Sequence, residues 1–195
     1  MDTLSLQHGF SYEVMTANVD EQDEQYRRPA PQELVLSLAR AKRDAIMKRH
    51  RQSMPGADFS GLLITCDQVV VHEGNILEKP DNVEQARLFI NGYSRSPAST
   101  VGSTIVTNMT TGSSVECVDE TRITFSKIRA EAVDALLTEG EVMWCAGALM
   151  VENPLLAPFL VSMEGGIDAV MGLCKESVMR GLVESWEAAE TQTSA

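Results

Sequence analysis

Apolar residues recur at intervals of three and four between residues 32 and 50, which is the spacing of one buried helix face. Pro31 suits the first turn of that helix. Glycine, proline and polar residues at 52–61 then indicate a surface loop. The run at 62–71 is short and rich in β-branched side chains, as is typical of a strand buried on both faces. The pattern therefore predicts a long helix followed by a buried strand.

Helices and strands continue to alternate along the rest of the chain. A second helix is predicted to begin near residue 81 or 82, and a pair of strands is predicted at 100–107 and 121–125, around a turn-like Thr-Thr-Gly-Ser-Ser segment at 110–114. Next come a short helix at 130–137, an apolar segment at 142–151, a last helix at 176–187 and a polar tail at 188–195. We therefore expect a single α/β domain over residues 1–195, with a mixed twisted sheet flanked by helices.

The charge of the chain narrows its partners. The 195 residues include 16 Lys and Arg against 28 Asp and Glu, a formal net charge of −12. So negative a surface repels nucleic acid and anionic membranes, and no apolar run approaches the roughly 18 residues needed to cross a bilayer. We expect no nucleic-acid or membrane partner. A small anionic ligand is still possible, because a few well-placed cations can dominate one cleft.

The cysteines argue against a structural zinc site. All four are widely separated, with no C-x-x-C pair and no histidine at ligand spacing. Reduced thiols of this kind fit the cytoplasm, and we expect the protein there.

Three charged residues stand where the surrounding pattern is apolar or in a loop beside it. Asp67 interrupts the predicted strand at 62–71, where a lone buried carboxylate would be costly. Lys42 continues the apolar stripe of the first helix, so its stem can pack while its ammonium points toward the sheet. Lys79 follows a predicted turn at 74–75 and can reach the same cleft.

Each of these residues also has an ordinary structural interpretation. An aspartate near a strand end is commonly a turn or cap former. Lys42 can belong to a solvated basic face, and Lys79 can be a simple loop lysine. The acidic run at 20–24 is typical of a solvated loop, although one of its carboxylates can reach a metal ion.

No common catalytic template explains this set of residues. The sequence has no phosphate-binding G-x-x-x-x-G-K-[ST] loop and no G-x-S-x-G nucleophile turn. A strand carboxylate, two lysines and an acidic loop suit a different task. Lysines can hold a polyphosphate, carboxylates can hold a divalent ion, and the ion with a carboxylate can activate water.

Six short segments, in order over about residues 10–185, resemble the Maf (septum formation inhibitor-like) nucleoside triphosphate pyrophosphatases, whose fold is related to that of the inosine triphosphate pyrophosphatases. The segments are Asn18-Val-Asp-Glu21, Glu33-Leu-Val-Leu-Ser-Leu-Ala-Arg-Ala-Lys42, Thr65-Cys-Asp-Gln-Val-Val-Val71, Glu78-Lys-Pro80, Cys145-Ala-Gly147 with Glu152, and Met171-Gly-Leu173. The resemblance implies hydrolysis of a nucleoside triphosphate to the monophosphate and pyrophosphate by a homodimer that uses Mg²⁺, or alternatively Mn²⁺.

The resemblance also implies roles for individual residues. Asp67 falls on the family's general base and, with Glu21, on its metal site, while Lys42 and Lys79 fall on lysines that contact phosphate. Two further positions, Gln68 and Glu152, fall on residues that differ between groups preferring dTTP and UTP (Thr with Gln) and groups preferring 7-methyl-GTP (Gln with Glu). The pair present here favours 7-methyl-GTP, with pyrimidine triphosphates as the alternative.

The family pattern is not matched at the N-terminus. Members begin with a strand and an S-S-S-x-x-R-R-x-x-L loop that holds the triphosphate, whereas this chain aligns from within the helix that follows. Three hypotheses follow from the sequence. The protein is an active pyrophosphatase, a nucleotide-binding or interaction paralogue that has lost the chemistry, or a fold in which Asp67 and both lysines form only a buried ion network.

Overall fold

The computed structural model describes residues 11–53 and 61–193, and side chains through residue 185. The elements in chain order are η1 (Glu24–Tyr26), α2 (Pro31–Ser53), β1 (Leu62–His72), β2 (Asn75–Leu77), α3 (Val83–Gly92), β3 (Ala98–Asn108), β4 (Ser114–Phe125), α4 (Ala130–Glu139), η2 (Glu141–Trp144), η3 (Ala146–Ala148), η4 (Ala157–Phe159), β5 (Leu160–Glu164), α5 (Ile167–Val170) and α6 (Lys175–Thr193). Most of the predicted loop at 52–61, and the part of the N-terminal segment at 1–10, lie outside the described residues.

The α/β class is confirmed, and the described residues form one five-stranded sheet in the order β2-β1-β3-β4-β5. Every pair of neighbouring strands in this sheet is antiparallel, so the expectation of a mixed sheet was wrong. The reason lies in the connections. Short turns join β1 to β2 and β3 to β4, so each of these pairs is antiparallel. The helical segments before β3 and β5 bring these strands back antiparallel to β1 and β4, respectively.

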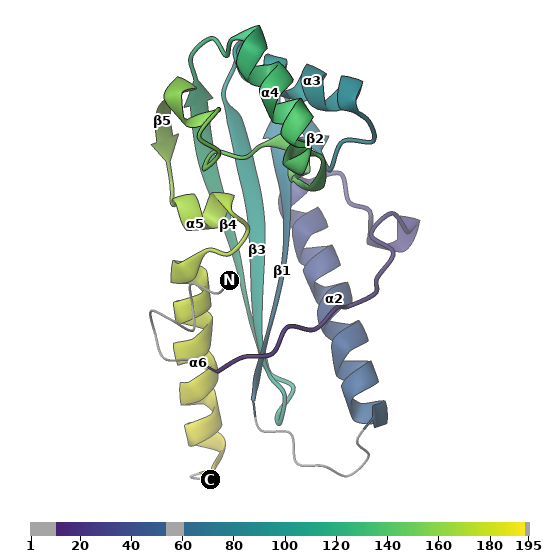
Figure 1. Cartoon of the computed structure of the whole chain (residues 1–195). Helices are drawn as coiled ribbons and strands as arrows, with labels where there is room; N and C mark the ends of the chain where they lie inside the picture. The colour runs from purple at the N-terminus through teal and green to yellow at the C-terminus, as the bar shows by residue number, and fades with distance from the viewer. Residues whose placement is uncertain (1–10, 54–60, 194–195) are drawn as a thin grey trace.

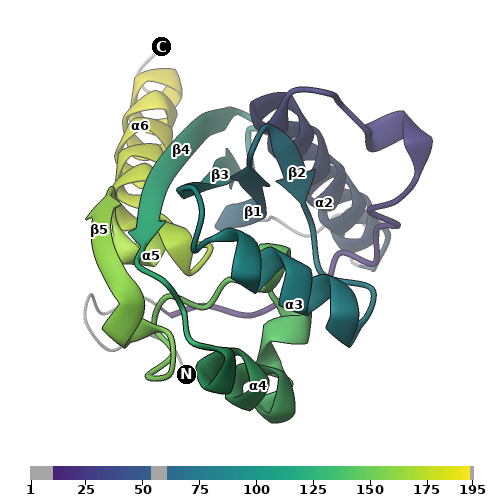
Figure 2. The ribbon, with the colours of Figure 1, turned by 90° about the horizontal axis from the view of Figure 1, so that it is seen from above.

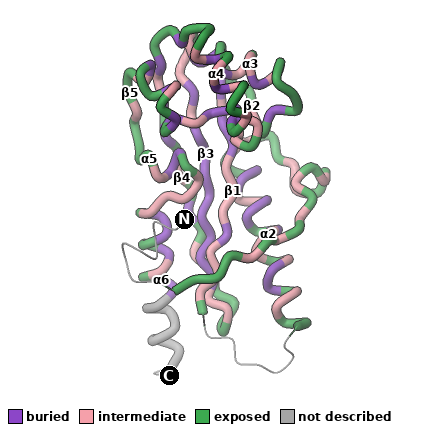
Figure 3. Tube along the Cα trace, in the orientation of Figure 1, coloured by how far each residue is buried: buried purple, intermediate pink, exposed green. Residues whose placement is uncertain are grey.

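Helices cover both faces of the sheet (Figures 1 and 2). On one face, Leu34, Val35 and Leu38 of α2 pack with Val69 of β1 and Val101 of β3. On the other face lie α5 and α6, while α3 and α4 close one end of the molecule. β3 is buried along nearly all of its length (Figure 3) because it lies between β1 and β4 and beneath both helical layers.

The helical predictions agree well with the structure. α2 begins at Pro31, α3 follows the N-cap Asn82, and the helices predicted at 130–137 and 176–187 are confirmed as α4 and α6. The strand predicted at 121–125 is too short, since β4 begins at Ser114. The apolar segment at 142–151 contains the 3-10 helix η3 and most of η2, and the short elements β2, β5 and α5 were not predicted.

Candidate active site

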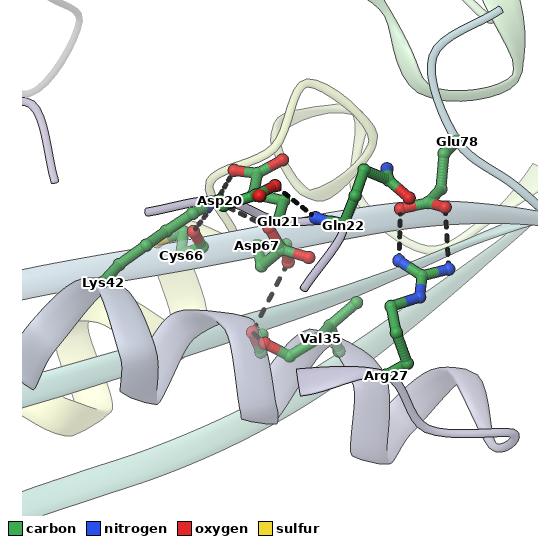
Figure 4. Close-up of polar contacts among 10 residues, drawn as sticks. Asp20, Glu21, Gln22, Arg27, Val35, Lys42, Cys66, Asp67 and Glu78 are labelled. Carbon is green, nitrogen blue, oxygen red and sulfur yellow. Dashed lines mark hydrogen bonds and ion pairs between the residues drawn. The ribbon is translucent and has the colours of Figure 1, made fainter. Parts of the chain in front are cut away.

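Lys42 and Asp67 meet between α2 and β1 (Figure 4). Lys42 lies on the sheet-facing side of α2, between the buried residues Leu38 and Ile46. Its Nζ lies 2.6 Å from Asp67 Oδ1, 2.8 Å from Glu21 Oε1 and 3.4 Å from the carbonyl oxygen of Cys66. An ammonium group has three donors, so these three acceptors match its full capacity. The lysine predicted from the apolar stripe therefore joins two predicted carboxylates.

Asp67 is held in the middle of β1, where it pairs with Ser103 of β3. Its side chain is only 7% exposed. Burial raises the pKa of Asp67 to about 6, and the neighbouring charge of Lys42 limits that rise. A carboxyl with this pKa is largely ionised at neutral pH and still binds a proton readily, which suits a general base.

Glu21 is the member of the acidic run that reaches this centre. It lies in a turn before η1 and its side chain is 40% exposed. Burial opposes its charge, but the hydrogen bond and charge of Lys42, together with the charge of Lys79, lower the pKa of Glu21. Asp20 and Asp23 instead accept hydrogen bonds from backbone amides in their own turns. The run is therefore partly a solvated loop and partly a source of one site carboxylate.

Lys79 lies in the exposed loop between β2 and α3. Its charge acts on Glu21 on one side and on the thiol of Cys145 on the other. Burial raises the pKa of Cys145, and the charges of Glu152 and Glu141 raise it further. Lys79 and Glu152 therefore both lie within electrostatic reach of Cys145, at the border of the site.

Gln68 points to the opposite face of the sheet from Asp67, as alternate residues of a strand do. Its Nε2 donates a hydrogen bond to the carbonyl oxygen of Ala169 in α5 at 2.7 Å. Its Oε1 lies 3.6 Å from where a Cβ on Gly172 would stand. Gln68 therefore contacts the α5 region, whereas Glu152 is exposed beside Cys145.

An open cavity of about 510 Å³ adjoins the Lys42 ammonium. Thr65 lies in its wall, and the Oγ1 of this threonine is buried without a hydrogen-bond partner among the described residues. Thr65 therefore lines the same cavity as two charged residues, Glu21 and Lys42. Its lining residues are Met15, Thr16, Ala17, Asn18, Val19, Glu21, Lys42, Ile46, Ile64, Thr65 and Cys66.

A divalent ion is compatible with the donors at this centre, but only if the substrate completes its coordination. Among the described residues, no group of three or more His, Cys, Asp and Glu side chains could hold a metal ion. Glu21 and Asp67 supply two carboxylates that converge on Lys42 Nζ. Mg²⁺ is commonly bound by one or two carboxylates together with substrate phosphates, so this donor set fits it.

An ion pair that the sequence did not predict joins Arg27 and Glu78 at the edge of the site. Arg27 Nη1 lies 2.9 Å from Glu78 Oε1, and Nη2 lies 2.8 Å from Oε2 (Figure 4). The two residues are 51 positions apart, and neither breaks a local pattern. No sequence signal could have paired them.

The fold and the site together define an α/β protein with a lysine-bridged carboxylate centre suited to a polyphosphate. The family model for Maf-like proteins matches residues 2–185, and the chain belongs to this family. It is 37% identical to a 7-methyl-GTP pyrophosphatase of Dictyostelium discoideum, over 86% of this chain and 83% of that protein.

Two bacterial relatives broaden this comparison. A nucleoside triphosphate pyrophosphatase of Salinispora tropica is 30% identical, over 90% of this chain and 75% of that protein. A dTTP/UTP pyrophosphatase of Neisseria meningitidis is 32% identical, over 86% of this chain and 80% of that protein.

Within the part of the chain that the structure describes, no helix has the length and apolarity to cross a membrane.

Proposed function

We propose that this protein is a nucleoside triphosphate pyrophosphatase, which hydrolyses its substrate to the nucleoside monophosphate and pyrophosphate. The observation that carries the proposal is the contact of Lys42 with both Asp67 and Glu21, in a chain that belongs to the Maf-like family. The names of the relatives, all pyrophosphatases, support the same reaction class.

In this reaction Asp67 is the general base, and the two lysines bind the phosphates. Asp67 accepts a proton from a water molecule as the water attacks phosphorus, because its buried carboxylate is ionised at neutral pH and has a pKa of about 6. The bond from the α-phosphorus to its bridging oxygen breaks, and pyrophosphate leaves. Lys79 binds phosphate oxygens, and Lys42 binds one by exchanging its 3.4 Å contact with the Cys66 carbonyl oxygen. These two cations attract an anionic substrate that a protein of net charge −12 would otherwise repel.

The proposal includes Mg²⁺, or alternatively Mn²⁺, held by Glu21 and Asp67. When bound, the ion supplies charge to the phosphates and lowers the pKa of a coordinated water. The donor chemistry supports this part of the proposal, since two carboxylates with substrate oxygens form a common magnesium environment.

For the base, we propose 7-methyl-GTP, with dTTP and UTP next. The carboxylate of Glu152 is suited to accept hydrogen bonds from N1–H and the exocyclic amine of a guanine, and Gln68 is the second residue of the pair. Similarity to a 7-methyl-GTP pyrophosphatase over most of both chains supports this order.

We further propose a single-domain, cytoplasmic homodimer. Four free cysteines are compatible with a reducing compartment. Large apolar side chains are exposed on β5, on α5 and its C-cap, and on α6, which supports self-association: Val161, Ile167, Met171, Met179 and Val183. Light scattering coupled to size exclusion would test the dimer.

The central experiment measures pyrophosphate release from 7-methyl-GTP, UTP and dTTP with Mg²⁺, for the wild type and Asp67→Asn. We expect turnover in the wild type and a loss of at least about 100-fold in the variant, as for removal of a general base. Asp44→Asn is the matched control, because Asp44 is an exposed aspartate on α2 that pairs with Arg43. Full activity of Asp67→Asn would reject Asp67 as the base. Nucleotide-dependent thermal stabilisation without turnover would instead identify a binding protein.

A further inference from the structure

The Arg27–Glu78 ion pair connects two segments on either side of the site. Arg27 Nη1 donates to Glu78 Oε1 at 2.9 Å and Nη2 donates to Oε2 at 2.8 Å, and the two side chains are 33% and 30% exposed. Arg27 directly follows η1, and Glu78 directly precedes Lys79. The pair therefore joins the segment that carries Glu21 to the loop that carries Lys79.

Glu78 also holds a third segment through its main chain. Its carbonyl oxygen accepts a hydrogen bond from the backbone amide of Gly147 at 2.9 Å. Gly147 is fixed in turn, because its own carbonyl oxygen accepts a hydrogen bond from Tyr93 Oη at 2.5 Å. The residue before Lys79 is thus anchored by its side chain on one side and by its backbone on the other.

The geometry of the pair matters more than its contribution to stability. A partly exposed ion pair contributes little to the stability of a fold. A bidentate arginine–carboxylate contact nevertheless fixes both distance and orientation, which a lysine cannot reproduce. The pair is also close enough to the centre for the charge of Asp67 to act on Arg27 and the charge of Glu78 to act on Asp67.

We propose that Arg27 and Glu78 are positioning residues, whose bidentate contact holds Lys79 at a fixed place relative to Glu21, Lys42 and Asp67. The inference rests on the proposed pyrophosphatase function. In this role neither residue touches the substrate. Lys79 would contact phosphate equally in the ground state and the transition state, so loss of its position raises KM and leaves kcat nearly unchanged.

The kinetic test uses two variants that remove charges of opposite sign, Arg27→Gln and Glu78→Gln, with 7-methyl-GTP and UTP as substrates. If the contact positions Lys79, both variants raise KM about tenfold, and the double variant is no worse than either single one. If the pair acts only through its charge on the anionic substrate, Arg27→Gln raises KM and Glu78→Gln lowers it. Opposite shifts of this kind would overturn the proposal.

Two further variants separate geometry from charge. Arg27→Lys keeps the positive charge but loses the bidentate contact, so we expect it to behave as Arg27→Gln does. The Arg40–Glu116 pair is also bidentate, through Nε and Nη2 of Arg40, but it joins α2 to β4. Glu116→Gln is therefore the matched control, and its KM should stay within about twofold of the wild type. A wild-type KM in Arg27→Lys would contradict the positioning role.

A readout without substrate keeps this inference separate from the proposed function. Hydrogen exchange of peptides covering residues 75–82 and 18–26, followed by mass spectrometry, should be faster in Arg27→Gln and Glu78→Gln than in the wild type. In Glu116→Gln both peptides should exchange as in the wild type. Unchanged exchange in the first two variants would overturn the inference even if the wild type is an active pyrophosphatase. If both variants exchange faster but the wild type has no pyrophosphatase activity, only the proposed reaction is rejected.

Discussion

Lys42 Nζ lies 2.6 Å from Asp67 Oδ1, although the two residues belong to different elements and stand 25 positions apart. Burial opposes the charge of each group, and each charge favours the other. The result is a raised pKa for Lys42, which also contacts Glu21, and a carboxyl at Asp67 whose pKa is about 6. The pair keeps a base and a cation side by side in their charged forms at neutral pH.

The pH dependence of activity should reflect Asp67. Because the carboxylate must be unprotonated to accept a proton, kcat/KM should be level above pH 6 to 7 and fall about tenfold per unit below the pKa of about 6. A pH–rate profile checks this. A level profile down to pH 4.5 would contradict it.

The same pKa predicts how stability depends on pH. The folded state binds the proton of Asp67 more tightly than the unfolded chain, whose aspartate has a pKa of 3.8. Ionisation of Asp67 therefore lowers the free energy of unfolding as pH rises from about 4 to about 6. Denaturant titrations should show this decrease in the wild type and a weaker one in Asp67→Asn.

Lys42→Met tests whether the lysine serves chemistry or only the fold. We expect at least about 100-fold lower turnover, because the variant loses a phosphate-binding cation and Asp67 loses the charge that lowers its pKa. Lys48→Met, at an exposed position of α2, is the control. Turnover and thermal midpoint should be measured separately. An active variant that is as stable as the wild type would favour a buried ion network without function.

Cys66 should be chemically inert despite its place beside Asp67. Burial raises the pKa of its thiol to about 11, so the nucleophilic thiolate is scarce at neutral pH. Treatment with iodoacetamide at pH 7.5 should leave Cys66 unmodified by peptide mass spectrometry, and Cys66→Ser should stay active. Inactivation in step with alkylation of Cys66 would contradict this prediction.

Gly147→Ala should destabilise the protein by about 2–5 kcal/mol, from backbone strain and crowding together. Gly147 has a φ of 61°, and an added Cβ would stand 2.5 Å from Tyr93 Oη and 2.8 Å from Val70 Cβ. Gly140→Ala is the control, because Gly140 has a φ of 78° with no heavy atom within 4 Å of the added Cβ. It should cost only about 1 kcal/mol. Equal effects of the two substitutions in denaturant titrations would show that crowding at Gly147 is relieved.

The double variant Gln68→Thr with Glu152→Gln tests base preference. We expect the ratio of kcat/KM for 7-methyl-GTP to that for UTP to fall by about tenfold or more. The reason is that the variant loses the Glu152 carboxylate, the acceptor that distinguishes guanine from a pyrimidine in this proposal. An unchanged ratio would remove both residues from base selection. The control is pyrophosphate release from UTP, which the variant should retain.

The sequence could predict residues whose local pattern carries the signal. Lys42 stands on an apolar helical stripe and Asp67 in an apolar strand, so both were found, and the resemblance to the Maf-like family is confirmed. Arg27 and Glu78 are ordinary in their own segments, and only the tertiary fold brings them together. β2 and β5 are too short to show a period, and strand direction depends on connections that periodicity does not encode.

Alternation along β1 gives its neighbouring residues separate surroundings. Asp67 contacts Lys42 of α2 on one face, and Gln68 contacts Ala169 of α5 on the other. Because each side chain is packed against a different helix, a substitution at one of these positions need not disturb the contacts of the next. Evolution can therefore vary residue 68 while the contact between Lys42 and Asp67 stays intact. Related proteins can thus diverge at the surface that residue 68 contacts without first losing the charged pair.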